Sequence, residues 1–385
     1  MGIVCPRCCH ARSGCSVTCR SEPNVPDRPT RAGIRPQQEV VITDPHRAGV
    51  DDTGSGPAAS DTGPTVAEVG EFGVIGRAVT GRVQPDTTLV GPGDDAAVVR
   101  APDGRVAVST DMLVEGRHFR WDWSAPEDVG RKAIAQNAAD VAAVGARPTA
   151  FLVALGCPPR TPARVLDALS DGIGRAAEEL GAGVVGGDLV QAEQIVVSVT
   201  VLGDLGGRPP VRRGGAREGD VVAVAGELGA SAAGLALLGT LGVERATELY
   251  PELVRAHRIP TPPYRAAEAA ARAGVHAMTD VSDGLVADLR HIAVASGVSI
   301  VIDAVPAPQA LVEPARSLGV DPASWVLGGG EDHAFAATFA ATDPLPPGWT
   351  RIGYVRAGSG GVTVTGAEPH DVDTEDGGGW QSFSP

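Results

Sequence analysis

Acidic residues stand at the ends of several apolar segments, each beside glycine or a hydroxyl residue. They are Asp94 and Asp95 in GPGDDAA, Asp111 in VSTD, Asp140 in NAADVAAVGA, Asp188 in VVGGD, and Asp280 and Asp283 in TDVSDG. A buried carboxylate is costly unless it is paired, hydrogen-bonded or bound to a cation. For any one of these acids, an N-cap or a buried salt bridge is an equal alternative. Because nearby basic partners are too few for the whole set, the set predicts a metal site.

Asp140 is the sharpest case in this set. It follows Asn137 by three positions within a run of small apolar residues, so a helix would place both side chains on one face. Ligands that offer only oxygen favour Mg²⁺ over zinc. After residue 65 the sequence has no His and Cys pairs at zinc spacing. The natural use of several hard cations is to hold polyphosphate.

Two further segments could bind phosphate. The turn Gly226–Ser231 stands between an expected strand and an expected helix, where free N–H groups favour an anion, although such turns often only connect elements. Arg212 and Arg213 could grip phosphate through charge-assisted hydrogen bonds, or could form a solvated basic loop.

Several other chemistries are excluded by the sequence. Lys132 is the only lysine and no G-x-x-x-x-G-K-[ST] motif occurs, so neither a P-loop nor a protein-kinase phosphate lysine can be placed. No G-x-S-x-G elbow for a serine hydrolase is present. A phosphoryl-transfer enzyme of this composition would neutralise charge mainly with metal ions.

The elements that position these residues alternate between strand and helix patterns. The box Ser124-Ala125-Pro126-Glu127 opens an expected helix that ends near Gly145, and Ser282 is expected to cap a helix that runs to Ser296. Further helices are expected over 162–180, from the glycine turn to about 241, and over 264–273, and strands over 105–109, 194–202, 220–225 and 299–302. This mixed order predicts an α/β or α+β fold.

Composition bounds the partners and the domains. The net charge of −15 argues against nucleic acid and anionic membranes, and no apolar run reaches roughly 18 residues. Five of the six cysteines lie before residue 20, which favours a reducing cytoplasm over a disulfide framework, although Cys5, Cys8, Cys15 and Cys19 could form a zinc knuckle. We expect a disordered extension over 1–65, and a boundary within 205–219 that separates domains at 66–207 and 208–385.

The motifs together resemble a known family. GPGDDAAVV, VSTDMLVEGRHF, GRKAIAQNAADVAAVGARP, GGD, RGGAREGDVVAVAGELGASAAGL, DVSDGL and GGGEDHAF follow the order of thiamine-monophosphate kinases, in the superfamily of aminoimidazole ribonucleotide synthetase. The resemblance spans Glu68 to Phe383. It implies an ATP- and magnesium-binding N-terminal domain that dimerises through its sheet, a C-terminal α/β domain, and ATP between the two.

The same resemblance implies roles for individual residues. The implied metal-binding residues are Asp95, Ser109, Thr110, Asp111, Asp140, Asp188, Asp280 and Asp283, with Asp111 and Asp140 as the catalytic pair. Arg213 and Ser282 would contact ATP, and His118, Glu331 and Trp380 would contact thiamine monophosphate. Trp380 suits stacking on a heterocycle and Glu331 suits the thiazolium charge, whereas His118 and Trp380 could also be structural.

The chain departs from the family pattern at four places. Ala139 and Val144 replace Ser and Met around the metal-binding Asp of the helix motif. His333-Ala334 stands where Tyr-Glu is common, and Trp380 is followed by Gln-Ser-Phe instead of Asp-His-Phe. The last two changes surround the implied acceptor site.

The resemblance implies in-line transfer of the γ-phosphoryl group of ATP to the phosphate of thiamine monophosphate, by a homodimer. A first alternative is another ATP-dependent synthetase of the superfamily, such as a purine-synthesis ligase or a selenophosphate synthase. The latter is disfavoured because no lysine precedes Lys132. A second alternative is a non-catalytic, nucleotide-binding maturation protein, which the intact acids disfavour.

Overall fold

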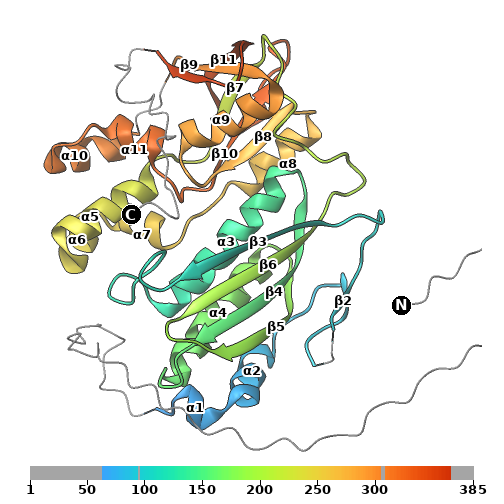
Figure 1. Ribbon diagram of the computed structural model, residues 1–385, viewed down its shortest axis with the longest axis vertical. Coiled ribbons are helices and arrows are strands. Elements are labelled where there is room, and N and C mark those ends of the chain that lie inside the picture. Colours follow the sequence, from blue (N-terminus) through green and yellow to red (C-terminus); the bar gives the residue numbers. More distant parts are fainter. Residues whose placement is uncertain (1–62, 94–95, 305–307, 366–385) are drawn as a thin grey trace, which may run out of the picture. The chain divides into compact units, whose positions relative to one another are not determined.

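A computed structural model describes residues 63–93, 96–304 and 308–365 of the chain (Figure 1). The expected extension up to residue 62, and the site candidates Asp95 and Trp380, therefore lie outside the described residues. Helix α1 (Val66–Val69) begins where the extension was expected to end. Its start is fixed by a capping box, in which Thr65 accepts from the Glu68 amide and Glu68 accepts from the Thr65 amide.

The elements fall into two halves, each with a main sheet. The first half contains α1, α2 (Glu71–Val79), β1 (Thr88–Val90), β2 (Val98–Val99), β3 (Ala107–Val114), α3 (Pro126–Ala143), β4 (Arg147–Cys157), α4 (Ala163–Glu179), β5 (Gly183–Gln191) and β6 (Val196–Asp204). The second half contains β7 (Val221–Ala225), α5 (Ala230–Leu241), α6 (Val243–Leu249), α7 (Pro251–Arg258), α8 (Tyr264–Arg272), β8 (Ala277–Val281), α9 (Leu285–Ser296), β9 (Val298–Ile302), α10 (Gln309–Leu318), α11 (Pro322–Gly328), β10 (Ala334–Phe339), β11 (Trp349–Ala357) and β12 (Val362–Val364).

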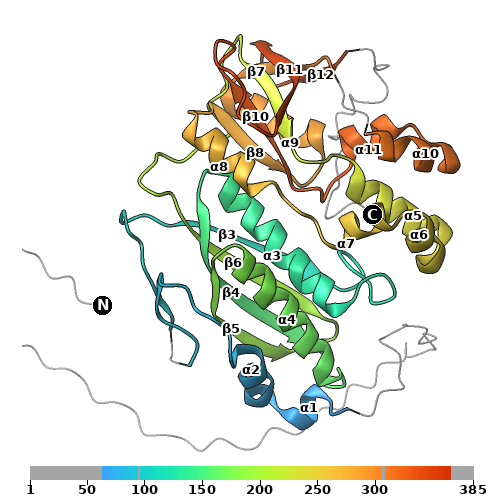
Figure 2. The ribbon, with the colours of Figure 1, turned by 180° about the vertical axis from the view of Figure 1, so that it is seen from behind.

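The first sheet has the order β3-β6-β4-β5, antiparallel except between β4 and β5. Helices α3 and α4 cover one face, as Figure 2 shows, and Figure 1 looks onto the opposite face. Residues of α3, α4 and the covered face form one hydrophobic core, with Ile134, Phe151, Leu166 and Leu169 almost fully buried. Burial of these side chains provides the main stabilisation of this half.

The second sheet has the order β12-β9-β11-β7-β10-β8, antiparallel except between β12 and β9. A core on one of its faces includes Leu237 of α5 and Leu289 of α9, and a second core includes Ala267 of α8 and Phe335 of β10. The mixed strand directions and the two sheets agree with the mixed α/β class expected from the sequence.

Helix α3 takes part in the cores of both halves. Ile134 and Ala138 pack in the core of the first sheet, whereas Ala139, Ala142 and Ala143 belong to the core that contains α8 and strands β7, β8 and β10. Small side chains allow this close approach on both sides. At Gly130, an added Cβ would lie 2.3 Å from the Leu169 carbonyl oxygen of α4, so only glycine fits at this crossing.

The observed elements confirm most of the predicted ones and correct three details. Strand β3 continues through Asp111 to Val114, well beyond the predicted end at residue 109. Asp128, and not Glu127, accepts from the backbone at the start of α3, through the Ala125 amide. Helix α9 begins after Gly284, so Ser282 is not its N-cap.

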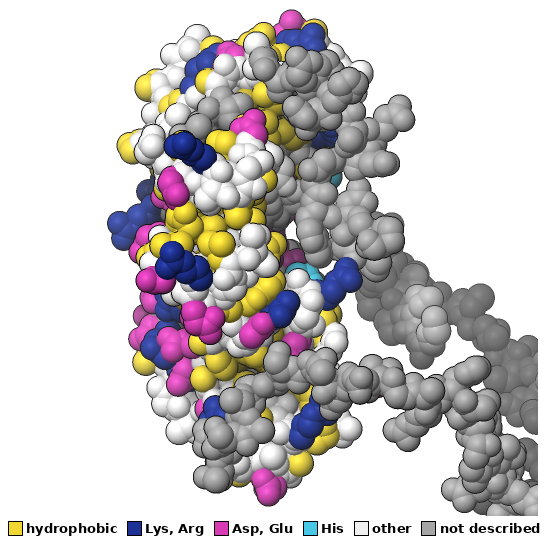
Figure 3. All heavy atoms as spheres, turned by 90° about the vertical axis from the view of Figure 1, so that its left-hand side faces the viewer, with side chains coloured by type: hydrophobic (Ala, Val, Ile, Leu, Met, Phe, Trp, Pro, Cys, Tyr) yellow, Lys and Arg dark blue, Asp and Glu magenta, His cyan; other side chains and the backbone are white. Residues whose placement is uncertain are grey.

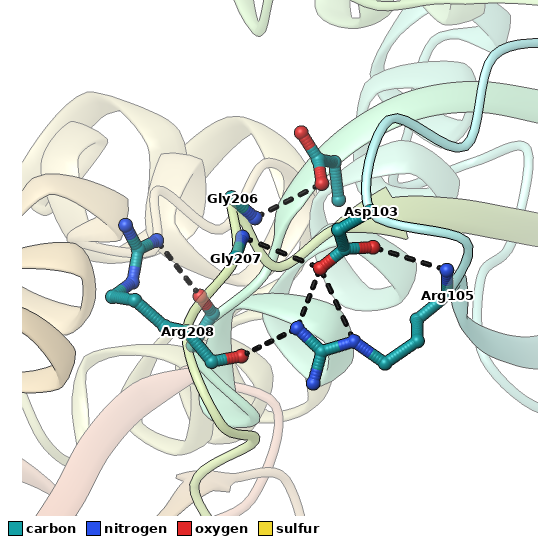
Figure 4. Close-up of polar contacts among 7 residues, drawn as sticks. Asp103, Arg105, Gly206, Gly207 and Arg208 are labelled. Carbon is teal, nitrogen blue, oxygen red and sulfur yellow. Dashed lines mark hydrogen bonds and ion pairs between the residues drawn. The ribbon is translucent and has the colours of Figure 1, made fainter.

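The segment that joins the halves is held by polar contacts with the turn before β3 (Figure 4). The guanidinium of Arg105 donates to the Arg208 carbonyl, and the Gly207 amide donates to Asp103. Arg208 in turn donates to the carbonyl of Gly145, just after α3. The linker thus starts from a fixed position beside the C-terminal end of α3.

The face in Figure 3 carries acidic and basic side chains close together, with hydrophobic side chains between them. Several charges pair across elements, such as Arg131 of α3 with Glu179 of α4 at 2.9 Å. Among the described residues, no helix combines the length and the apolar character that crossing a bilayer requires.

Candidate active site between the two halves

The acids predicted from β3 and α3 lie together on the covered face of the first sheet. The Ser109 hydroxyl donates to Asp140 Oδ2 at 2.6 Å, and the Asp111 amide donates to Asn137 Oδ1 at 3.0 Å. Asn137 is itself fixed, because its Nδ2 donates to the Ala133 carbonyl one turn earlier. As predicted, Asn137 and Asp140 lie on the same face of α3, where they meet strand β3.

These carboxyl groups crowd one another in a partly buried site. Burial, followed by the charge of Asp280, raises the pKa of Asp140 to about 7, although the Ser109 hydrogen bond opposes this rise. Burial likewise raises the pKa of Asp111. Asp280 comes from β8 of the second half, so acids from both halves share one site. Such like-charge crowding is the arrangement that a divalent cation relieves.

His333 lies directly behind Asp280. Its Nδ1 is 3.1 Å from Asp280 Oδ2, and both side chains are almost fully buried. Burial opposes the charged form of His333, but the hydrogen bond and charge of Asp280 outweigh it and raise the pKa of His333. The residue that replaces the common Tyr therefore orients a predicted metal-binding acid.

Glu331 and His118 meet at the N-terminal part of α3 around the only lysine. Lys132 Nζ lies 3.1 Å from Glu331 Oε1 and donates to the His118 carbonyl oxygen at 3.2 Å. Burial opposes ionisation of Glu331, but the charge of Lys132 holds the pKa of Glu331 below its ordinary value. The Glu331 side chain is 32% exposed, so a ligand can reach part of it.

Thr110 and Asp188 lie on the open face of the same sheet. Thr110 Oγ1 accepts from the Thr200 hydroxyl beside it, while Asp188 aligns with Ala154 and, across β4, with Ser198. Strand alternation turns Ser109 and Asp111 to the covered face and Thr110 to the other. Within this chain, therefore, Thr110 and Asp188 are not brought together with Asp140.

The segment after β8 carries Ser282 and Asp283, and Arg213 of the linker before β7 acts on Asp283 through its charge. Asp288 Oδ2 accepts from the amides of Ser282 and Asp283 at 3.0 and 3.1 Å, which fixes this turn. Burial raises the pKa of Asp283, and the charge of His291, with a smaller effect of Arg213, opposes the rise. Asp283, Asp288 and His291 also offer ligand atoms within 4.8 Å of one another. Ser282 thus directly precedes a predicted metal-binding acid, and the charge of Arg213 reaches the same acid.

The turn Gly226–Ser231 does not offer the free amides expected of an anion site. The amides of Gly229 and Ser231 donate to the two oxygens of Asp332, at 2.6 and 2.8 Å. Asp332 therefore occupies the start of α5 and fills the place expected for phosphate. The sequence alone gave no sign that an acid so distant in the chain would cap this helix.

The donors at the site fit magnesium. Asp111, Asp140 and Asp280 supply carboxylate oxygens, and Ser109 adds a hydroxyl oxygen. Hard oxygen ligands in a crowded anionic cluster are the ligands that Mg²⁺ prefers. Asp95, a further candidate, lies outside the described residues.

Two family models and several known proteins match this chain. Residues 93–205 match the family model "AIR synthase related protein, N-terminal domain", and residues 217–364 match the corresponding C-terminal domain model. A thiamine-monophosphate kinase of Mycobacterium tuberculosis is 56% identical over 323 residues, which cover 83% of this chain and 93% of that protein. The chain belongs to the thiamine-monophosphate kinase family.

Other relatives of the thiamine-monophosphate kinase family support the same assignment. The kinase of Corynebacterium glutamicum is 42% identical over 334 residues, covering 85% of this chain and 97% of its own. A solved structure described as AaThiL complexed with AMPPCP and TMP superposes with a TM-score of 0.65 at 34% identity, over 84% of this chain and all of that one.

Sequence reasoning missed several residues that shape the site. Lys132 was noticed only as the sole lysine, although it stands inside a family motif, and His333 was noticed only as a departure. His257, whose Nδ1 lies 3.6 Å from Glu331 Oε2, and Asp332 gave no local signal. Their importance arises from contacts between segments distant in the chain.

Proposed function

We propose that this chain transfers the γ-phosphoryl group of ATP to the phosphate of thiamine monophosphate and so forms thiamine diphosphate and ADP. Family membership supports the assignment, and the related AaThiL structure holds an ATP analogue together with TMP. The observation that carries it is the meeting of Asp111 and Asp140 with Asp280, beside the Lys132–Glu331 pair.

The chemistry needs little proton transfer. The acceptor phosphate is anionic near neutral pH, so it requires no strong general base. The main tasks are to align the acceptor oxygen with the γ-phosphorus and to neutralise the gathered negative charge. The Ser109, Asn137 and His333 contacts hold Asp140, the Asp111 backbone and Asp280 in fixed orientations for this purpose.

Magnesium would be held by Asp95, Ser109, Asp111, Asp140, Asp280 and Asp283, with Thr110 and Asp188 as further expected ligands. When bound, it would neutralise charge on the transferring phosphates and on the acceptor. The chain's own acids would then be fully ionised. This is consistent with a pKa of Asp140 that lies near 7 without a cation.

Recognition of the two substrates would be divided between the neighbouring segments. Arg213 and Ser282, beside the turn that Asp288 fixes, would contact ATP. His118 and Glu331 would contact the acceptor, together with Trp380, which lies outside the described residues. Glu331 suits this task because its side chain is 32% exposed while Lys132 holds its Oε1.

The family resemblance also implies a homodimer that pairs through the first sheet, with domains at 66–207 and 208–385. The open face supports this pairing, because it presents exposed Val108 (65%), Met112 (51%) and Val190 (54%). A second copy would cover these side chains and would face Thr110 and Asp188. The cytoplasmic location expected from the cysteine distribution stays a prediction.

The decisive test is a chromatographic assay with ATP, Mg²⁺ and thiamine monophosphate. Equal amounts of thiamine diphosphate and ADP, both lost on addition of EDTA, are the expected result. ATP binding without thiamine diphosphate would overturn the proposed acceptor and move the chain to a related activity of the superfamily.

A further inference from the structure

The ion pair between the buried Lys132 and the partly exposed Glu331 joins the two halves of the molecule. Lys132 extends from α3 of the first half, and Glu331 belongs to the loop before β10 of the second. The Lys132 side chain is 3% exposed, and its Nζ contacts both Glu331 Oε1 and the His118 carbonyl oxygen. The only lysine of the chain thus contacts two residues that are expected at the acceptor site.

The loop that carries Glu331 has a strained backbone. Glu331 and His333 have φ values of 63° and 51°, which side-chain-bearing residues rarely adopt. At Gly330, directly before Glu331, an added Cβ would lie 2.5 Å from the Ser282 carbonyl oxygen. The loop therefore packs closely against the end of β8. Such strain persists only where surrounding contacts enforce it.

Those contacts connect the loop to Asp280. The Glu331 amide donates to the Ser282 carbonyl at 2.8 Å, and the His333 amide donates to the Val281 carbonyl at 2.9 Å. The His333 side chain then contacts Asp280. A displacement of Glu331 is therefore transmitted to the segment that bears Asp280.

Helix α3 interacts with the second half at two points, Glu331 and Asp280. Lys132, Gln136 and Asp140 follow one another at intervals of four residues, so they form a stripe along one face of the helix. Lys132 reaches Glu331 at one end of the stripe, and the charge of Asp280 acts on Asp140 at the other. Between them, Gln136 hydrogen-bonds to Asp111.

We propose that Lys132 is a positioning residue for phosphoryl transfer. Through Glu331, it holds the loop 329–333 against α3 in the register that places Asp280 beside Asp140. This inference rests on the proposed function, because its effect on kcat is measured in the thiamine diphosphate assay. A role in stability alone is the weaker account, because ion pairs that involve a buried charge often add little net stability and their best-attested use is to fix register.

The first test compares charge removal at two neighbouring positions of α3. Lys132→Met is expected to lower kcat about 10²-fold, the loss typical of misplaced catalytic groups, and Lys132→Arg is expected to recover part of it. Arg131→Met is the matched control, because Arg131 pairs with Glu179 within the first half, and it should keep normal turnover. Normal kcat in folded Lys132→Met would overturn the proposal.

A double-mutant cycle separates positioning from stability. If Lys132 acts through Glu331, adding Lys132→Met to Glu331→Gln should lower kcat little further than Glu331→Gln alone does. Losses that multiply would overturn the proposal. Melting temperatures of all four proteins are measured in parallel, and turnover is compared well below the lowest of them. Coupling seen in melting temperature but absent from kcat would also overturn it.

The wild-type protein offers a test that needs no turnover. Because Lys132 is the only lysine, ¹⁵N-lysine labelling gives a single side-chain ammonium signal. We expect Glu331→Gln to shift this signal and thiamine monophosphate to shift it in the wild type. An unchanged signal in Glu331→Gln would overturn the proposal. If Glu331→Gln shifts the signal but the wild-type protein forms no thiamine diphosphate, the ion pair is confirmed and the proposed function is rejected.

Discussion

The two faces of the first sheet carry the same kinds of residue in opposite environments. On the covered face, Ser109 and Asp111 meet Asp140 of α3, and burial raises the pKa of both acids. On the open face, Thr110 and Asp188 lie among exposed apolar side chains such as Met112. Ser109, Thr110 and Asp111 are consecutive in the sequence, yet strand alternation divides them between the two faces.

Residues that are consecutive in a motif therefore do not necessarily lie in one binding site. Ser109 and Asp111 point to one side of β3 and Thr110 to the other. All three can bind ligands only if a further surface packs against each side of the strand. Helix α3 and the second half supply the covered face. For the open face, the proposed second copy of the chain would supply the missing surface. The covered face is built by folding alone, whereas the open face would be completed only by the proposed second copy.

The largest effect is expected at the covered face. Asp140→Asn removes a charge that both crowds Asp280 and would hold magnesium, so we expect turnover to fall by about 10³-fold or more. The fold should persist with equal or higher melting temperature at pH 8, because the variant also removes like-charge repulsion. The thiamine diphosphate assay and thermal unfolding measure the two effects.

Asp167→Asn is the control for this substitution. Asp167 pairs with Arg77 on the exposed side of α4, and exposed pairs of this kind contribute about 0–1 kcal/mol. Its turnover should match the wild type. If folded Asp140→Asn retained normal turnover, the covered face would not be the catalytic one.

A smaller effect is expected at the open face. Val108→Lys or Met112→Lys would place a charge within the proposed dimer contact, so we expect at least a tenfold weaker dimer. Light scattering after size-exclusion chromatography measures this change. Turnover should fall along with the dimer fraction, because Thr110 and Asp188 would lose their facing surface.

Val294→Lys serves as the matched control, because Val294 is equally exposed on α9 of the second half. It should leave both the mass and the turnover unchanged. A wild-type protein that is monomeric at assay concentrations and fully active would contradict the division between the two faces.

Local patterns predicted much of the fold, for reasons that the structure makes clear. The helix from Pro126 to Ala143 has a proline at its start and small apolar residues throughout, and both signals are local. The strand at 105–109 was predicted too short because Asp111 interrupts its apolar run. In the structure, that polar position faces α3, so the strand continues to Val114.

The family was predictable from the motifs, whereas the arrangement of the candidate site was much less so. Acids beside glycine and hydroxyl residues indicated a magnesium site, and the motif order indicated the family. The Lys132–Glu331 pair and the cap that Asp332 forms on α5 were not predictable, because each joins segments distant in the sequence. Contacts of this kind leave no periodic or spacing signal.

The smallest effect concerns stability at His257 of α7, beside the Lys132–Glu331 pair. Burial, then the charge of Lys132, lowers the pKa of His257 to about 4. The unfolded chain would bind a proton near pH 6.5, whereas the folded chain does not. The stabilisation from neutral His257 is therefore present above pH 6.5 and is lost as the pH falls toward 4, by about 2 kcal/mol at pH 5. Urea unfolding at pH 7.5 and pH 5 should thus show a smaller loss for His257→Gln than for the wild type. Equal losses would mean that burial does not lower the pKa of His257 in the folded protein.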